Sequence, residues 1–229
     1  MAGSANSRPD QWSSAGAAEP PKPLDFLFMV TATPYLYVTF AAAALFGDAQ
    51  IDASGHTHWP DRAVIRVWVD PRHAPAGADT LVGQAMTTWM QAAAGHFTLE
   101  KTAARDGAAV RVSFIGANGN YGEARPRIDR LSGAIVEADV HIASPIAGDE
   151  LTRRIIVYLT ALHELGHALG LHHTDVFADI MYSFREPDDG ERYFAVYRRR
   201  LRSADDIGSD RATGLAPGDR AALRALYGR

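Results

Sequence analysis

Short runs of alternating apolar and polar residues recur after residue 60 and predict strands. Residues 63–69 read Ala-Val-Ile-Arg-Val-Trp-Val and stop at Asp70-Pro71, where a strand would end. Residues 110–115 repeat this pattern, and residues 133–142 contain one or two further strands. From about residue 48 onward, strands alternate with helices.

Apolar residues at helical spacing predict two amphipathic helices, one over residues 78–94 and one over residues 149–169. On the first helix, the residues expected on the buried face are Leu81, Ala85, Met86, Trp89 and Met90. On the second, the residues expected on the core side are Leu151, Ile155, Leu159 and Leu162.

The first part of the chain follows neither pattern. Residues 1–23 are rich in Ser, Ala, Pro and Gly and carry too little apolar surface to fold alone. Residues 26–46 form an uncharged apolar run of 21 residues, which is long enough to cross a bilayer as a helix. We therefore assign residues 1–23 to a polar tail, residues 24–47 to a transmembrane anchor or signal segment, and residues 48–229 to a folded domain.

The distribution of basic residues predicts how this apolar run is oriented. Basic residues precede it, and no Lys or Arg follows before Arg62. The positive-inside tendency then leaves the N-terminus in the cytoplasm and the domain outside. The domain is either membrane-anchored or, after cleavage near Gly47 or Ala49, secreted. The alternative is a buried hairpin in which residues 35–40 form a strand.

Composition sets wider bounds on the protein. The chain has 229 residues, of which 47% are hydrophobic and 22% charged, as in a globular domain with a sizeable core. A formal net charge of -4 gives no reason to expect a nucleic-acid partner. The chain contains no cysteine, so it has neither disulfides nor thiolate metal ligands.

The strongest chemical signal is the run His-Glu-Leu-Gly-His-Ala-Leu-Gly-Leu-His-His at residues 163–173. His163 and His167 are four residues apart, so a helix projects both from one face, where they can bind one zinc ion. Glu164 lies about 100° around the helix, beside the metal, where a general base is needed. Taken alone, these five residues also fit an amphipathic helix with two exposed histidines.

The residues after this helix make a third ligand available. Gly170 can adopt the left-handed conformation that ends a helix and reverses the chain, which returns His173 to the metal. Three protein ligands leave a fourth position for water, as in catalytic rather than structural zinc sites. Met181 follows eight residues beyond His173, within Ile-Met-Tyr-Ser.

These motifs resemble the metzincin zinc proteases, whose H-E-x-x-H-x-x-G-x-x-H sequence is followed by a Met-turn. Met181 matches the methionine that underlies the metal site in that family. Ser183 stands where astacins and serralysins place a tyrosine ligand, which argues against those groups. Thr174 after the third histidine and the closing helix expected at residues 215–228 are similar to the matrixins, the catalytic domains of matrix metalloproteinases and their bacterial relatives. This likeness spans about residues 58–229.

The resemblance implies an α+β fold. It comprises a mixed, mostly parallel twisted sheet with an antiparallel edge strand, an active-site helix, a Met-turn and a C-terminal helix. It also implies that the strand before the active-site helix, residues 135–143, is the sheet edge to which an extended peptide substrate adds. The residues expected in this substrate-binding strand are Ile135, Val136, Glu137, Ala138, Asp139, Val140 and His141.

Other polar residues have weaker claims to a role. His172 is one residue out of register with the ligands and is expected either at the surface or behind them. His56 and His58 are expected in solvent, and His141 is expected to be an ordinary strand residue. Oxygen ligands for a possible calcium ion are offered by Asn118, Asn120, Glu123 and Asp129, although a polar loop is the simpler interpretation.

Two features depart from the matrixin pattern. Residues 116–142 lack a His-x-Asp element, so a structural zinc is not expected, and the chain has no propeptide cysteine to keep it latent. Residues 184–213 form an insertion longer than the usual link between the Met-turn and the closing helix. It contains a basic group that is expected on a solvated face rather than at lipid or substrate, namely Arg198, Arg199, Arg200 and Arg202.

Three classes of function follow from these observations. The first is a zinc endopeptidase, in which Glu164 accepts a proton from a metal-activated water during peptide hydrolysis. The second is a zinc amidase that acts on another amide, such as a cell-wall peptide. The third is an inactive metal-binding interaction module, which the intact Glu164 argues against.

Overall fold

The computed structural model describes residues 57–116, 121–186 and 188–228. Five strands and four helices follow one another in these residues, together with a short 3-10 turn at Ala204–Asp206. The strands are β1 (Ala63–Val69), β2 (Phe97–Thr102), β3 (Val110–Ile115), β4 (Gly122–Ile128) and β5 (Ile135–Ala143). The helices are α1 (Ala78–Ala93), α2 (Glu150–Ala168), α3 (Asp189–Arg198) and α4 (Pro217–Tyr227).

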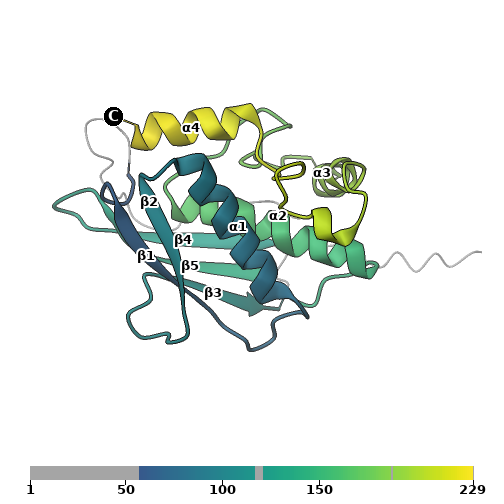
Figure 1. The fold of residues 1–229 in the computed structure, drawn as a ribbon, viewed down its shortest axis with the longest axis horizontal. Helices are drawn as coiled ribbons and strands as arrows, with labels where there is room; N and C mark the ends of the chain where they lie inside the picture. Colours follow the sequence, from purple (N-terminus) through teal and green to yellow (C-terminus); the bar gives the residue numbers. More distant parts are fainter. Residues whose placement is uncertain (1–56, 117–120, 187, 229) are drawn as a thin grey trace, which may run out of the picture. The chain divides into compact units, whose positions relative to one another are not determined.

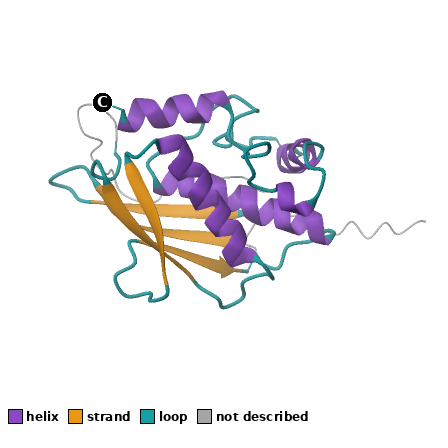
Figure 2. Cartoon of the chain, viewed as in Figure 1, coloured by secondary structure: helices purple, strands orange, loops and turns teal. Residues whose placement is uncertain are grey.

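The strands form one sheet in the order β2-β1-β3-β5-β4, in which only β4 runs antiparallel to its neighbour. The predicted α+β fold, with a mostly parallel sheet and one antiparallel edge strand, is therefore confirmed. Figures 1 and 2 show the helices gathered on one side of the strands. Because α1 and α2 cover this side, the residues of β3 and β5 that face it are buried and apolar.

The prediction that residues 135–143 form the sheet edge is wrong. β5 pairs with β3 on one side and with β4 on the other, so β4 is the edge strand. β4 reads Gly-Glu-Ala-Arg-Pro-Arg-Ile, and its charges and proline obscure the strand pattern in the sequence. A proline and exposed arginines are nevertheless typical of an edge strand, because they discourage pairing with another chain.

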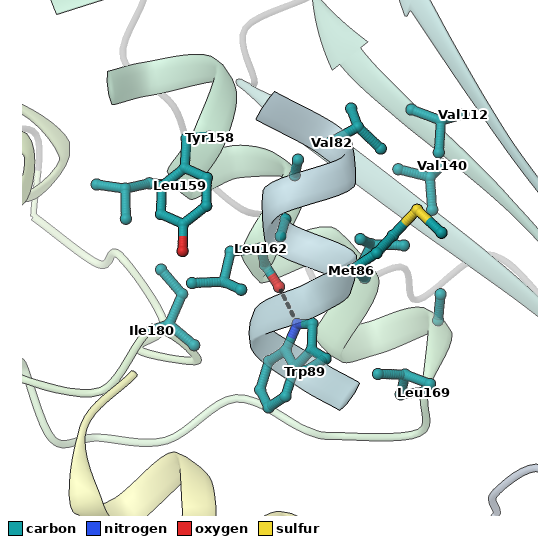
Figure 3. Close-up of a cluster of buried hydrophobic side chains, with 14 of the residues drawn as sticks. Val82, Met86, Trp89, Val112, Val140, Tyr158, Leu159, Leu162, Leu169 and Ile180 are labelled. Carbon is teal, nitrogen blue, oxygen red and sulfur yellow. Dashed lines mark hydrogen bonds between the residues drawn. The ribbon is translucent and has the colours of Figure 1, made fainter. Parts of the chain in front are cut away.

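The core lies between the sheet and the two long helices. Trp89 on α1 is fully buried, and its indole nitrogen donates a hydrogen bond to the carbonyl of Leu162 on α2, 2.8 Å away (Figure 3). One turn earlier on α1, Met86 points toward Val112 and Val140 of the sheet (Figure 3). This packing fixes α2, which carries the histidines, against the rest of the domain.

Most predicted elements are present, and the ones that sequence reasoning missed have mixed patterns. Residues 133–142 contain one strand, β5, and the expected helices correspond to α1, α2 and α4. β2 was not predicted, because half of its side chains face solvent. α3 lies within the expected insertion 184–213, and its ten residues bury only Asp189, Tyr193, Phe194 and Tyr197.

The predicted polar tail and the apolar run at residues 26–46 lie outside the described residues, so their assignments stay predictions. Among the described helices, none has both the length and the apolar character needed to span a bilayer.

Candidate active site

Helix α2 is defined by clear signals at both of its ends. The carboxylate of Asp149 caps the first turn by accepting a hydrogen bond from the backbone N–H of Thr152, at 2.7 Å. At the other end, the N–H of Leu171 donates to the carbonyl of Gly166 and the N–H of Gly170 donates to that of His167. This pair of bonds is a Schellman motif, and it requires the positive φ of 98° found at Gly170. The chain therefore turns back directly after the second histidine.

This reversal brings His173 to the two histidines of α2. The Nε2 atoms of His163, His167 and His173 lie 3.1–3.3 Å from one another. Three nitrogens bound tetrahedrally to one zinc ion at 2.0–2.1 Å would be about 3.3 Å apart. Within the described residues, these three form the one cluster of His, Cys, Asp or Glu side chains that could hold a metal ion.

Two of these imidazoles are held in place by hydrogen bonds from their other ring nitrogen, Nδ1. Nδ1 of His163 lies 2.6 Å from the carbonyl oxygen of Ile180, and Nδ1 of His167 lies 2.9 Å from that of Leu171. A carbonyl only accepts, so each Nδ1 carries the proton and each Nε2 presents a lone pair to the others. The donor set therefore fits a divalent cation.

Burial keeps these imidazoles in the neutral form that binds metal. It is the largest cause that lowers the pKa of His163 well below its usual value, and it lowers the pKa of His167 to about 4. The pKa of the half-buried His173 is also lowered, again first by burial.

Glu164, the candidate general base, follows His163 on α2 and is also buried. Its side chain is 1% exposed, and its Oε1 atom has no hydrogen-bond partner within the protein. Burial, followed by the charge of Glu123, raises the pKa of Glu164 well above its usual value. A buried, unpaired carboxyl oxygen is costly to a fold, so its presence here indicates a chemical role.

Gly122, the first residue of β4, makes room for this carboxylate. A Cβ atom at this position would lie 2.6 Å from Oε1 of Glu164 and 2.6 Å from Cγ2 of Thr160. The edge strand therefore begins directly against the candidate base, and only glycine fits there.

Met181, the predicted Met-turn residue, packs against α2 between its two histidines. It is 1% exposed, and its Sδ atom would be 2.4 Å from a Cβ added to Gly166, which lies between the two histidines of α2. The carboxylate of Asp219, near the start of α4, accepts hydrogen bonds from the N–H groups of Ile180 and Met181, at 2.9 and 3.2 Å. The closing helix therefore holds the turn whose Ile180 carbonyl orients His163.

The other histidines considered in the sequence analysis do not belong to the cluster of three. His172 is exposed, as expected. His58 is half-buried rather than solvated, because its Nδ1 donates to the carbonyl of Trp59 and its ring packs edge-on against Tyr227. His141 lies in β5 and shares a hydrogen bond with Ser113 of β3, at 2.8 Å. His56 lies outside the described residues.

The proposed calcium ligands do not come together in the described residues. Glu123 forms an ion pair with Arg125, and Asp129 accepts hydrogen bonds from Leu131 and Ser132 in its own turn. Asn118 and Asn120 lie outside the described part of the chain. In the insertion, Arg198 pairs with Asp149 at 2.9 Å. The other members of this basic group, Arg199, Arg200 and Arg202, are exposed, as predicted.

Four features together define a metzincin-type catalytic domain. They are a mostly parallel sheet with an antiparallel edge strand, a helix carrying two histidines, a third histidine after a glycine turn, and a supporting methionine. Residues 67–197, more than half of the chain, match the family model of the matrixins, the M10 peptidases. The chain belongs to the matrixin family. A comparison with curated proteins finds no match.

Sequence reasoning missed two residues that shape this site, namely Gly122 and Asp219. Asp219 had a usable signal, since an acidic residue two positions after Pro217 is typical of a helix N-terminus. Gly122 had none, because its role depends on a contact with α2, which is distant in the sequence.

Proposed function

We propose that this protein is a zinc-dependent endopeptidase. Membership of the matrixin family supports a peptidase and implies a catalytic zinc. The observation that carries the proposal is the convergence of three Nε2 atoms, together with the buried Oε1 atom of Glu164, the residue that follows His163 on α2, which lacks a hydrogen-bond partner. A carboxylate in this position serves proton transfer rather than stability.

His163, His167 and His173 would hold the ion through their Nε2 atoms. Zinc bound there would supply a Lewis acid for the peptide carbonyl and lower the pKa of a bound water to about 7. Glu164 accepts the proton of the attacking water at Oε1 and then donates it to the nitrogen of the leaving amine. Burial, which raises the pKa of Glu164, suits this carboxyl to hold a proton between the two steps.

The substrate is an extended peptide that pairs with β4. Within the described residues the outer edge of β4 pairs with no strand, and its first residue, Gly122, abuts Glu164. A peptide added to this edge would run past the candidate base. Because β4 and not β5 is the edge strand, the substrate-binding role passes from residues 135–143 to residues 122–128.

The apolar run at residues 26–46, and the absence of Lys and Arg between this run and Arg62, support export of the catalytic domain. We propose that the domain works outside the cytoplasm, either anchored by this run or released after its cleavage. Fractionation of cells that express the full chain tests this, since a cytosolic peptidase of full mass contradicts it.

The peptidase proposal is tested with the full-length chain on casein, on a cell-wall peptide and without substrate, each with and without a chelator. We expect cleavage of casein that the chelator abolishes and added zinc restores. Glu164→Ala should keep its zinc and lose about 10²- to 10⁴-fold in kcat/KM. Glu150→Ala, an exposed acid on the same helix, is the matched control and should keep full activity.

Cleavage of the cell-wall peptide alone would replace the proposal with an amidase. A zinc-loaded protein that cleaves neither substrate would indicate a binding module, and full activity in Glu164→Ala would remove Glu164 from the mechanism.

A further inference from the structure

Helix α3 lies in the part of the chain where a longer insertion was expected, and its first residue is one of the most buried acids in the protein. Asp189 is 1% exposed. Its Oδ2 atom accepts three hydrogen bonds, all from the segment that follows the Met-turn. The donors are the Tyr182 hydroxyl at 2.9 Å, the Arg185 N–H at 3.1 Å and the Glu186 N–H at 3.0 Å. The Oδ1 atom faces the guanidinium of Arg192, at 3.3 Å.

The segment held in this way, residues 182–186, borders the metal ligands. The ring of Phe184 lies 6.0 Å from the ring of His163. The N–H of Ser183 donates to the carbonyl of Thr174, the residue after the third ligand, at 3.0 Å. Arg185 forms an ion pair with Asp175 on the same stretch. One Asp189 carboxylate therefore sets the backbone of a segment that touches two sides of the ligand cluster.

The same helix also reaches the edge strand. The Phe194 ring packs edge-on against Tyr121, with ring centroids 5.1 Å apart, and a Cβ atom on Gly190 would lie 3.4 Å from the Tyr121 ring. Tyr121 directly precedes Gly122, which abuts Glu164. α3 therefore contacts both segments that flank the site: the start of β4 and residues 182–186.

We propose that Asp189 is a positioning residue for substrate, fixing residues 182–186 so that they contact an extended peptide seated between this segment and β4. This role deepens the proposed function and rests on it. Asp189 touches no reacting atom, so its loss weakens peptide binding and leaves the chemical step intact. Because all three donors to Oδ2 lie outside α3, this oxygen acts on the segment, and only Oδ1 faces a residue of its own helix.

The test compares Asp189→Ala, Asp189→Asn and the neighbouring Asp188→Ala in the full-length protein. Asp188 is exposed and makes no side-chain capping bond, so it is the matched control. Each variant is assayed with a fluorogenic peptide that spans four residues on either side of a cleavage site mapped in casein. KM, kcat and bound zinc are measured for each.

We expect Asp189→Ala to raise KM by about 5- to 10-fold, with kcat within about twofold of wild type and zinc unchanged. Asp189→Asn keeps an oxygen that can face the three donors, so it should restore KM to within about twofold. Asp188→Ala should match the wild type. Shortening the peptide from one of its ends should abolish the difference in KM, which identifies the part of the substrate that residues 182–186 contact.

A zinc-loaded Asp189→Ala variant with wild-type KM, or one that loses kcat at constant KM, overturns the role of Asp189. If this variant does not fold, Tyr182→Phe removes one donor and keeps the ring, and we expect KM to rise by about 2- to 3-fold. An unchanged KM in Tyr182→Phe then overturns the proposal. A wild-type protein that cleaves no peptide contradicts the proposed function instead.

Discussion

The metal side and the substrate side of the site are held together in different ways. On the metal side, His163 and His167 donate to the carbonyls of Ile180 and Leu171, and Asp219 accepts hydrogen bonds from the Met-turn. On the substrate side, Gly122 at the start of β4 abuts Glu164, and Asp189 holds residues 182–186, which lie just before it in the sequence. The candidate metal ligands thus come from one helix and the reversal that follows it, whereas the substrate side combines an edge strand with a loop far from it in the sequence. Changes on the two sides should separate metal binding from turnover.

The largest effect is expected on the metal side, from His167→Ala. Removing one of three ligands leaves too few nitrogens to retain zinc, so bound metal should disappear and hydrolysis should fall by on the order of 10⁴-fold. Metal analysis measures the bound zinc, and a casein assay measures the rate of hydrolysis. His172→Ala, an exposed neighbour, is the control and should keep metal and activity. Zinc at wild-type stoichiometry in His167→Ala would remove His167 from the ligand set.

On the substrate side, Gly122→Ala should give the opposite result, with zinc kept and turnover lost. The new methyl group would overlap Oε1 of Glu164 and Cγ2 of Thr160, each 2.6 Å away, so the base must shift. A displacement near 1 Å costs about 10²-fold in rate. Gly116→Ala, where a Cβ meets no atom within 4 Å, is the control. If kcat/KM stays at the wild-type level in Gly122→Ala, β4 does not constrain the base.

Asp219→Ala should weaken the metal side without changing KM for the peptide. Three backbone N–H groups, of Ile180, Met181 and Ala216, would lose their acceptor. We expect the free energy of unfolding to fall by about 2–4 kcal/mol and zinc affinity by about 10- to 100-fold. Urea unfolding and competition with a chelator measure these quantities. Asp205→Ala, on an exposed turn, should change neither, and equal zinc affinity in Asp219→Ala would contradict the proposed support of His163.

The smallest effect is expected far from both sides, at Asp149. Its hydrogen bond to Arg198, and then the N–H of Thr152, hold the pKa of Asp149 well below its usual range. Stabilisation from a lowered carboxyl pKa is complete above about pH 4 and is lost as the pH falls toward the folded-state value. Asp149→Ala should therefore unfold at lower urea than wild type at pH 7, and this gap should narrow at pH 3.

Both proteins are unfolded in the presence of a chelator, so that loss of metal at low pH does not affect the difference in stability between them. Glu150→Ala is the control and should show no such narrowing. A gap that widens below pH 4 would contradict the assignment of Asp149 as a charged cap. Zinc content and KM should be unchanged at pH 7, because Asp149 supports α2 at the end opposite the histidines.

The difference between the two sides also explains what the sequence could predict. The ligands, the base, the glycine turn and Met181 lie within residues 163–181, where helical spacing and one reversal determine which side chains meet. The edge strand was misassigned because the charges and the proline of β4 obscure its strand pattern, so the sequence did not predict a strand outside β5. The α3 contact with residues 182–186 depends on a carboxylate whose three donors precede it in a loop without periodicity.

The hydrogen bonds from the Met-turn to Asp219 have a consequence for the order in which the protein matures. During translation, all three histidines leave the ribosome well before the closing helix does. Until that helix docks, the Met-turn lacks two of its hydrogen bonds, so the carbonyl that orients His163 is less firmly held. The support of the candidate metal site is therefore completed only when the last helix of the domain has been made.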